Sequence, residues 1–177
     1  MVGCPFEVVE PHVDEGMDEA GSAGPDPGSL VEAVARRKAE AVAARFPGRL
    51  VVGADTVVVL DGQVMGKPTG PAEAVRMLQQ LSGRWHTVYT GVAVAGPEPG
   101  AVETRHVRTD VRFRPLQPAW IERYVQTGEP LDKAGAYGIQ GRGSLLVAEI
   151  RGCYYTVVGL PLAALADMLE ERGVSLL

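Results

Sequence analysis

The stretch Leu50-Val-Val-Gly-Ala-Asp-Thr-Val-Val-Val-Leu-Asp-Gly-Gln-Val-Met65 decides the fold of this chain. It begins as an apolar run that ends in a small-residue turn at 53–55, and Thr56–Leu60 continues the apolar pattern. Asp61-Gly62 is a strong signal for a two-residue β-hairpin, so the chain should return through Gln63–Met65. The stretch therefore predicts buried strands with a hairpin at their end.

Helices and further strands are expected on both sides of this stretch. Ser29 matches a helix N-cap with Glu32 as its capping-box partner, and that helix should run to about Arg45. Three more helices are expected over residues 71–81, 117–127 and 162–171, and strands over 5–9, 85–95, 104–113 and 145–150. Because a turn joins the strands of the 86–113 region while helices separate the others, we expect an α/β fold with a mixed, twisted sheet and flanking helices.

The composition is typical of a globular protein. The chain has 177 residues, which fits one domain over 1–177, with 46% hydrophobic and 22% charged residues. Its formal net charge of -5 argues against a nucleic-acid partner, because such surfaces need Lys and Arg to meet phosphates. A few local cations would still suffice for a small anionic ligand.

We expect a cytoplasmic protein with no membrane partner. No apolar run approaches the ~20 residues of a membrane span, and the N-terminus lacks a basic region followed by an apolar one. Cys4 and Cys153 lie far apart in the chain. They are a poor basis for a disulfide framework, which favours a reducing compartment.

Asp55 is the first candidate for chemistry. It follows a buried apolar run, so the pattern predicts that it lies at the carboxyl end of a strand, where open α/β sheets bind ligands. A carboxylate there can ligate Mg²⁺ together with substrate phosphates, or orient a water molecule. An N-cap or turn aspartate explains the same pattern, and the residues alone leave both interpretations open.

Lys67 lies between Gly66 and Pro68, and the residue before a proline is held in an extended conformation. A lysine fixed in this way near Asp55 can neutralise a phosphate as a point charge. An ordinary exposed lysine is the alternative interpretation. The spacing of a Walker A loop is absent from the sequence.

The segment from Glu129 to Gly141 is rich in turn residues and carries Asp132, Lys133 and Gln140. Its glycines allow the backbone to approach a ligand closely. Gln140 offers both donors and acceptors, which suits the reading of a nucleobase edge. An irregular loop without function is the alternative.

Other polar residues give weaker signals. Asp14 and Glu15 would add carboxylates to a metal held by Asp55, although an acidic loop explains them equally well. The three histidines have no ligand-like spacing, so we interpret them as sheet-face or surface residues. A serine or cysteine nucleophile is disfavoured, because Ser144 lacks the Gly-x-Ser-x-Gly elbow and Cys153 has no CxxC partner.

Taken together, the segments are far more specific than any one of them. The chain closely resembles the Maf family of nucleoside triphosphate pyrophosphatases over nearly its whole length. The blocks that carry this resemblance occur in family order: Pro5-Phe-Glu-Val-Val9, Val13-Asp-Glu15, Arg37-Lys-Ala39, Val52-Gly-Ala-Asp-Thr56, Gly66-Lys-Pro68, Leu81-Ser-Gly83, Leu131-Asp-Lys-Ala-Gly-Ala-Tyr-Gly-Ile-Gln-Gly141 and Val158-Gly-Leu-Pro-Leu162.

The resemblance implies a two-lobed, Maf/ITPase-like α/β fold around a cleft. It implies hydrolysis of a nucleoside triphosphate between the α and β phosphates, with a divalent metal, Mg²⁺ or Mn²⁺. Asp55 would be the proton acceptor and, together with Glu15, a metal ligand and acidic catalytic residue. Lys67 would be the catalytic, phosphate-contacting lysine.

The resemblance also bears on substrate and assembly. Thr56 and Gln140 match positions tied to base choice, and Asp132 and Lys133 belong to the same substrate-binding block. The Asp-Thr and Ile-Gln-Gly forms are similar to the subgroup that acts on dTTP and UTP. Family members include dimers, so a homodimer is one expected assembly.

Family members also begin with a strand and a Ser-x-Ser-Pro-Arg-Arg turn, which this sequence does not contain. A strand and a helix of ordinary length amount to roughly 20 residues, so the domain is expected to be N-terminally truncated. Three hypotheses follow. The chain is a dTTP/UTP pyrophosphatase, a nucleotide-binding or regulatory protein that lost turnover with the phosphate-binding turn, or a scaffold with an inherited core.

Overall fold

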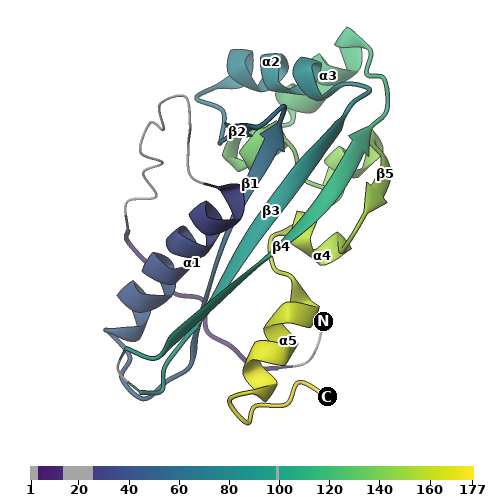
Figure 1. Ribbon diagram of the computed structural model, residues 1–177. Helices are drawn as coiled ribbons and strands as arrows, with labels where there is room; N and C mark the ends of the chain where they lie inside the picture. The colour runs from purple at the N-terminus through teal and green to yellow at the C-terminus, as the bar shows by residue number, and fades with distance from the viewer. Residues whose placement is uncertain (1–3, 14–25, 99) are drawn as a thin grey trace. The chain divides into compact units, whose positions relative to one another are not determined.

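Among the residues that the structure describes, five strands form one sheet in the order β2-β1-β3-β4-β5. The computed structural model describes residues 4–13, 26–98 and 100–177 (Figure 1). Its helices and strands are α1 (Pro27–Ala43), β1 (Val51–Leu60), β2 (Gln63–Met65), α2 (Pro71–Leu81), β3 (Trp85–Ala95), β4 (Val102–Phe113), α3 (Pro118–Gln126), η1 (Glu129–Asp132), η2 (Ala134–Ala136), η3 (Gly141–Leu146), β5 (Val147–Arg151), α4 (Tyr154–Val158) and α5 (Leu162–Glu170), where η marks 3₁₀-helices.

The α/β class with flanking helices is confirmed, and the sheet is antiparallel. β1 and β2 pair antiparallel, with Val58 opposite Met65, across the hairpin turn expected at Asp61-Gly62. Both turn residues have positive φ, 52° and 77°, as such a turn requires. We expected a mixed sheet, but the described strands are antiparallel because hairpins join β1 to β2 and β3 to β4, and hairpin-linked strands run in opposite directions.

The chain divides into two compact units, and the boundaries fall inside β1, β3 and β4. The first unit contains Met1–Asp55, Thr90–Val107 and Leu160–Leu177. The second contains Thr56–Tyr89 and Arg108–Gly159. Each unit has its own hydrophobic core.

In the first unit, α1 packs unusually close to the strands. Its inner face presents Ala35 and Ala39, which form a buried cluster with Ala93 and Ala95 of β3. A Cβ at Gly53 of β1 would lie 2.5 Å from the carbonyl oxygen of Ala35, so only glycine fits there. The small residues at 53–55 therefore do not form the turn that we expected, and β1 continues through them to Leu60.

α5 packs on the strands of the first unit through larger side chains. Leu165, Met168 and Leu169 form a buried cluster with Val92 and Val94 of β3.

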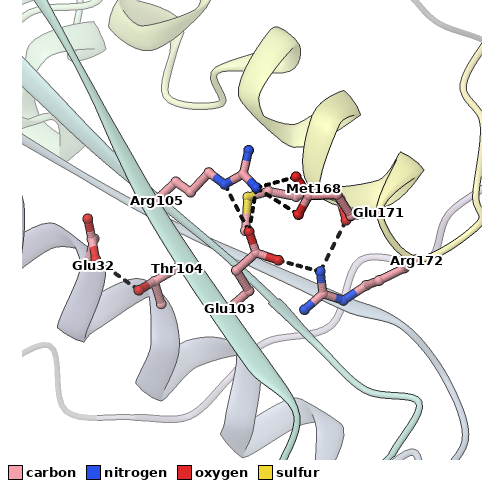
Figure 2. Close-up of polar contacts among 7 residues, drawn as sticks. All are labelled: Glu32, Glu103, Thr104, Arg105, Met168, Glu171 and Arg172. Atoms are coloured by element: carbon pink, nitrogen blue, oxygen red, sulfur yellow. Dashed lines mark hydrogen bonds and ion pairs between the residues drawn. The ribbon is translucent and has the colours of Figure 1, made fainter.

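An ionic network adds to this contact (Figure 2). Glu103 of β4 accepts hydrogen bonds from Arg105 at 2.8 Å and from Arg172 at 2.6 Å, and Arg105 also donates to Glu171 at 2.7 Å. The network ties the end of α5 to β4.

The second unit is built around Phe113, Leu78 and Leu81, which are fully buried. α2 and α3 supply most of the apolar side chains that cover its strands. His86 lies in this core, 3% exposed, with its Nε2 atom 2.8 Å from the hydroxyl of Tyr137. The rings of His86, Phe113 and Tyr137 pack edge to face.

Helix α1 begins earlier than expected. Asp26 is its N-cap, and the Asp26 side chain accepts a hydrogen bond from the backbone N–H of Ser29 at 3.0 Å. Ser29 is thus not the cap, because Pro27 already starts the helix. Glu32 is not a capping-box partner either, since it accepts a hydrogen bond from Thr104 at 2.8 Å.

The strand expected at Pro5–Val9 is not formed, because residues 4–13 have no regular secondary structure. Phe6 and Val8 are 80% and 84% exposed, so no apolar contact fixes this segment as a strand. Cys4 and Cys153 are both free thiols. Among the described residues, no helix is long and apolar enough to cross a membrane.

Candidate active site

Asp55 forms an ion pair with Lys38 of α1. The Nζ atom of Lys38 lies 2.8 Å from Oδ1 of Asp55, and the two side chains are only 15% and 16% exposed. Asp55 lies within β1 rather than at the carboxyl end of a strand, so the sequence argument for its position was wrong. A half-buried ion pair of this kind is a stronger functional signal than a turn aspartate.

The close packing of α1 brings this pair together. Side chains alternate along a strand, so Asp55 lies on the same side of β1 as Gly53, which is two residues earlier. Gly53 contacts the backbone of Ala35 and Ala39, and Lys38 lies between those two alanines in the helix sequence. The ammonium therefore meets the carboxylate at a point where the helix and strand backbones approach closely.

The second unit brings Lys67, Asp132 and Lys133 together. Lys133 donates to Oδ1 of Asp132 at 2.6 Å, and this hydrogen bond is the main cause that lowers the pKa of Asp132. The positive charge of Lys67 lowers that pKa further. The backbone N–H of Gly135 donates to the carbonyl of Gly66 at 3.0 Å, which holds the turn beside the lysine.

Gln140 lies exposed at the start of η3, in the same unit. Gly138, two residues earlier, lies against the side chain of Lys133, since a Cβ there would be 3.1 Å from the lysine's Cδ and Cε. The structure therefore places the backbone next to Gln140 against the cationic segment that carries Lys133. An amide on the segment that packs against Lys133 can read the polar edge of a ligand whose anionic part the lysine binds.

Thr56 follows Asp55 in β1 and is half-buried. Because consecutive strand residues point to opposite faces, its hydroxyl leaves the strand on the side away from Asp55. It faces Gly159, where a Cβ would lie 3.5 Å from Oγ1 of Thr56.

The comparison with known proteins decides the family. A family described as "Maf-like protein" matches residues 1–172. The chain belongs to the Maf family. Curated relatives of this Maf protein are named dTTP/UTP pyrophosphatase.

Three of these relatives cover almost the whole chain. The protein from Moorella thermoacetica is 54% identical over 173 residues, which span 98% of this chain and 87% of the relative. That from Symbiobacterium thermophilum is 54% identical over 172 residues, or 97% and 86% of the two chains. That from Dictyoglomus turgidum is 47% identical over 176 residues, or 99% and 90%.

The Maf chain was expected to hold a metal through Asp55 and Glu15, but Glu15 and Asp14 lie outside the described residues. Within the described ranges, no group of three or more His, Cys, Asp or Glu side chains could hold a metal ion. Asp55 alone still fits a Mg²⁺ or Mn²⁺ ion that comes with its substrate, because such ions often take one or two carboxylates and fill their other positions with phosphate oxygens and water.

The remaining polar candidates are the three histidines and Ser144. His86 is buried, His106 lies 2.5 Å from Glu32, and His12 is exposed. Ser144 donates to the carbonyl of Gly141 at 2.7 Å and is exposed.

Sequence reasoning missed the role of Lys38. Its place in the charged run Arg36-Arg37-Lys38 favours the solvent-facing side of a helix. The structure shows Arg36 and Arg37 exposed and Lys38 half-buried between the inner alanines. The signal was present: a lysine three residues after Ala35 and one before Ala39 lies beside the apolar stripe of the helix.

Proposed function

We propose that this Maf protein hydrolyses dTTP and UTP to the nucleoside monophosphate and pyrophosphate. The proposal is supported by relatives of that name that share about half of its residues over nearly the full chain. The observation that carries it is the Lys38–Asp55 pair, since it gives the first unit an ionised carboxylate in a half-buried position.

The chemistry follows from the groups present. A water oxygen attacks the α-phosphorus, the bond from that phosphorus to the bridging oxygen breaks, and pyrophosphate leaves. Asp55 accepts the proton of the water, and the ammonium of Lys38 at 2.8 Å holds its carboxylate in place. Lys67 stabilises the negative charge that develops on the phosphates.

The phosphates also need charge neutralisation. A divalent ion, Mg²⁺ or Mn²⁺, would neutralise phosphate charge when bound, with Asp55 and Glu15 as its protein ligands. Gln140 and Thr56 would choose the base, and Asp132 and Lys133 would support substrate binding. A cytoplasmic location fits both a nucleotide substrate and the two free thiols.

The decisive experiment measures pyrophosphate release from dTTP, UTP, CTP, GTP and ATP, with Mg²⁺, with Mn²⁺ and with a chelator. We expect turnover of dTTP and UTP with a divalent ion and little without one. Asp55→Asn should lower kcat at least about 100-fold, because it removes the proton acceptor.

Asp61→Asn is the matched control, since Asp61 is an exposed hairpin carboxylate that pairs with Arg84. It should leave kcat unchanged. A wild-type chain that binds dTTP in calorimetry but releases no pyrophosphate would replace the proposal with a nucleotide-binding role. No binding at all would leave only a scaffold.

A further inference from the structure

We propose that Glu129 and Tyr124 are positioning residues that set nucleobase selectivity by clamping the backbone on both sides of Gln140. This inference rests on the proposed function, in which Gln140 reads the base. It concerns residues that have no contact role in the chemistry proposed above, and all of them lie in the second unit.

The carboxylate of Glu129 holds the chain that follows Gln140. Its Oε1 accepts a hydrogen bond from the backbone N–H of Gly143 at 2.9 Å. Its Oε2 accepts one from the N–H of Arg142 at 3.0 Å. These N–H groups open the 3₁₀-helix η3, which has no side-chain cap of its own, so Glu129 satisfies donors that the helix cannot.

Tyr124 holds the chain that precedes Gln140. Its hydroxyl donates to Oε1 of Glu129 at 3.0 Å and accepts from the backbone N–H of Gly138 at 3.3 Å. The ring is 5% exposed, so this hydroxyl is fixed in the core. Through Tyr124, one carboxylate therefore reaches residues on both sides of Gln140.

The protonation states support this arrangement. Burial works to raise the pKa of Glu129, but the hydrogen bonds from Gly143, Arg142 and Tyr124 outweigh it and hold the pKa below its ordinary value. Burial raises the pKa of Tyr124, which keeps its hydroxyl protonated. An ionised carboxylate accepts only, so the Tyr124 proton must point to Glu129, and its oxygen is then available to Gly138.

Two glycines show how tightly the clamp residues, Glu129 and Tyr124, hold this segment. A Cβ at Gly143 would lie 2.1 Å from the carbonyl oxygen of Gly138, so the two sides of the segment touch. Gly141 has φ +64°, and a Cβ there would meet Oε2 of Glu129 at 2.9 Å. Residues 138–143 are thus a closed loop with Gln140 exposed at its tip.

A closed loop fixes the amide before the nucleotide arrives. Discrimination between bases is strong only when the reading group is held in place, because a mobile amide can adapt to the wrong base. Lys133 donates to the carbonyl of Glu129 at 3.0 Å, so the same turn also anchors the cationic segment.

The test compares Glu129→Gln and Tyr124→Phe with Gln140→Ala and with both double variants. Selectivity is measured as kcat/KM for UTP over ATP, and as the ratio of their dissociation constants in calorimetry. Each clamp variant should lower selectivity about 10-fold, mainly through KM for UTP. In the Gln140→Ala background the same substitutions should change it less than about two-fold, because they act through Gln140.

Two controls separate positioning from stability. Glu122→Gln on α3 removes an exposed carboxylate and should change nothing. Hydrogen exchange measures the hydrogen bonds to Glu129 without any turnover. The amides of Arg142 and Gly143 should exchange faster in Glu129→Gln, while the amides of β1 stay protected.

The outcomes are distinguishable from those of the proposed function. A wild-type chain that turns over no nucleotide contradicts the proposed function, and selectivity is then read from binding alone. Clamp variants that lose thermal stability but keep the UTP preference overturn the inference. Equal losses of selectivity with and without Gln140 would also overturn it.

Discussion

At the scale of single residues, Lys38 is the finding with the most direct consequence for activity. Its ammonium lies 2.8 Å from the carboxylate of Asp55, and both side chains are largely shielded from solvent. Removing one member of a half-buried ion pair leaves the other charge poorly compensated. The carboxylate then loses the contact that orients it for proton transfer.

We therefore expect Lys38→Met to lower kcat about 100-fold, as the loss of a positioned acid–base partner does. Lys38→Arg keeps the charge and should retain part of the activity. Arg37→Met removes an exposed cation from the neighbouring position and serves as the control. Steady-state kinetics with dTTP checks all three, and a Lys38→Met enzyme with wild-type kcat would show that the pair is only structural.

At the scale of elements, the contact between α1 and β3 depends on Gly91. A Cβ there would lie 2.3 Å from the carbonyl oxygen of Val31, and backbone atoms cannot move aside as a flexible side chain can. Gly91→Ala should lower the free energy of unfolding by about 1–3 kcal/mol through overpacking.

Urea unfolding checks this, with Gly70→Ala as the matched control because no atom lies within 4 Å of a Cβ at Gly70. Gly70 is the N-cap of α2, where alanine is less favourable than glycine, so that control should lower the free energy of unfolding by less than about 1 kcal/mol. If the two alanine variants are equally stable, the helix tolerates displacement from the strand.

The network in Figure 2 ties α5 to β4 through Glu103. Hydrogen bonds from Arg172 and Arg105 lower the pKa of Glu103, although burial opposes them. A lowered pKa in the folded state means that the stabilisation is complete above the unfolded value of about 4.3 and is lost as pH falls through the folded value.

Glu103→Gln should therefore lower the free energy of unfolding by about 1 kcal/mol at pH 7, the upper end for partly exposed pairs. At pH 3 the difference from the wild type should be smaller, because below about 4.3 the unfolded chain binds a proton at this carboxyl group while the folded chain resists it. Glu98→Gln, an exposed carboxylate in the β3–β4 connection, should be neutral at both pH values. Urea titrations at the two pH values measure the difference.

At the scale of the whole molecule, the global stability should depend on pH through His86. Burial lowers its pKa from 6.5 to about 4, despite the opposing charge of Asp110. Nδ1 has no hydrogen-bond partner among the described residues, so the core does not accommodate a proton there. The unfolded chain binds that proton below 6.5, and stability is therefore lost as pH falls from 6.5 towards 4.

We expect the free energy of unfolding to fall by about 2 kcal/mol between pH 7.5 and pH 5 through this histidine. His86→Gln should flatten that dependence, because glutamine can still bond the Tyr137 hydroxyl but does not titrate. His12→Gln changes an exposed histidine and should keep the wild-type slope. A wild-type slope in His86→Gln would contradict the assignment.

Much of this molecule could be predicted from local sequence patterns. The 71–81 helix has the expected bounds, and the hairpin at Asp61-Gly62 forms as expected, because both depend on nearby residues. The turn that we expected at 53–55 was wrong. Gly53 instead allows a close contact with α1, which comes from a distant part of the chain. Lys38 was missed for the same reason: its partner becomes evident only once helix and strand have packed together.

The candidate site divides in the same way. The resemblance to the family pointed to Asp55, Lys67 and Gln140. Asp132 and Lys133 are adjacent in the chain, so their ion pair depends only on local sequence. Glu129 and Tyr124 carry no motif that names them as supports of Gln140. Their role depends on hydrogen bonds to backbone N–H groups, which any residue type supplies and which no sequence pattern marks.

Gly53 determines the geometry of the Lys38–Asp55 ion pair. Its missing side chain sets how far the helix stands from the strand, and so how far the ammonium of Lys38 must reach to Asp55. Gly53 takes no part in the chemistry, yet its substitution would lower activity in a mutational screen, as substitution of Lys38 or Asp55 would. Because a Cβ there meets backbone atoms of α1, Gly53→Ala would displace the helix and change the Lys38–Asp55 distance without replacing either reactive group.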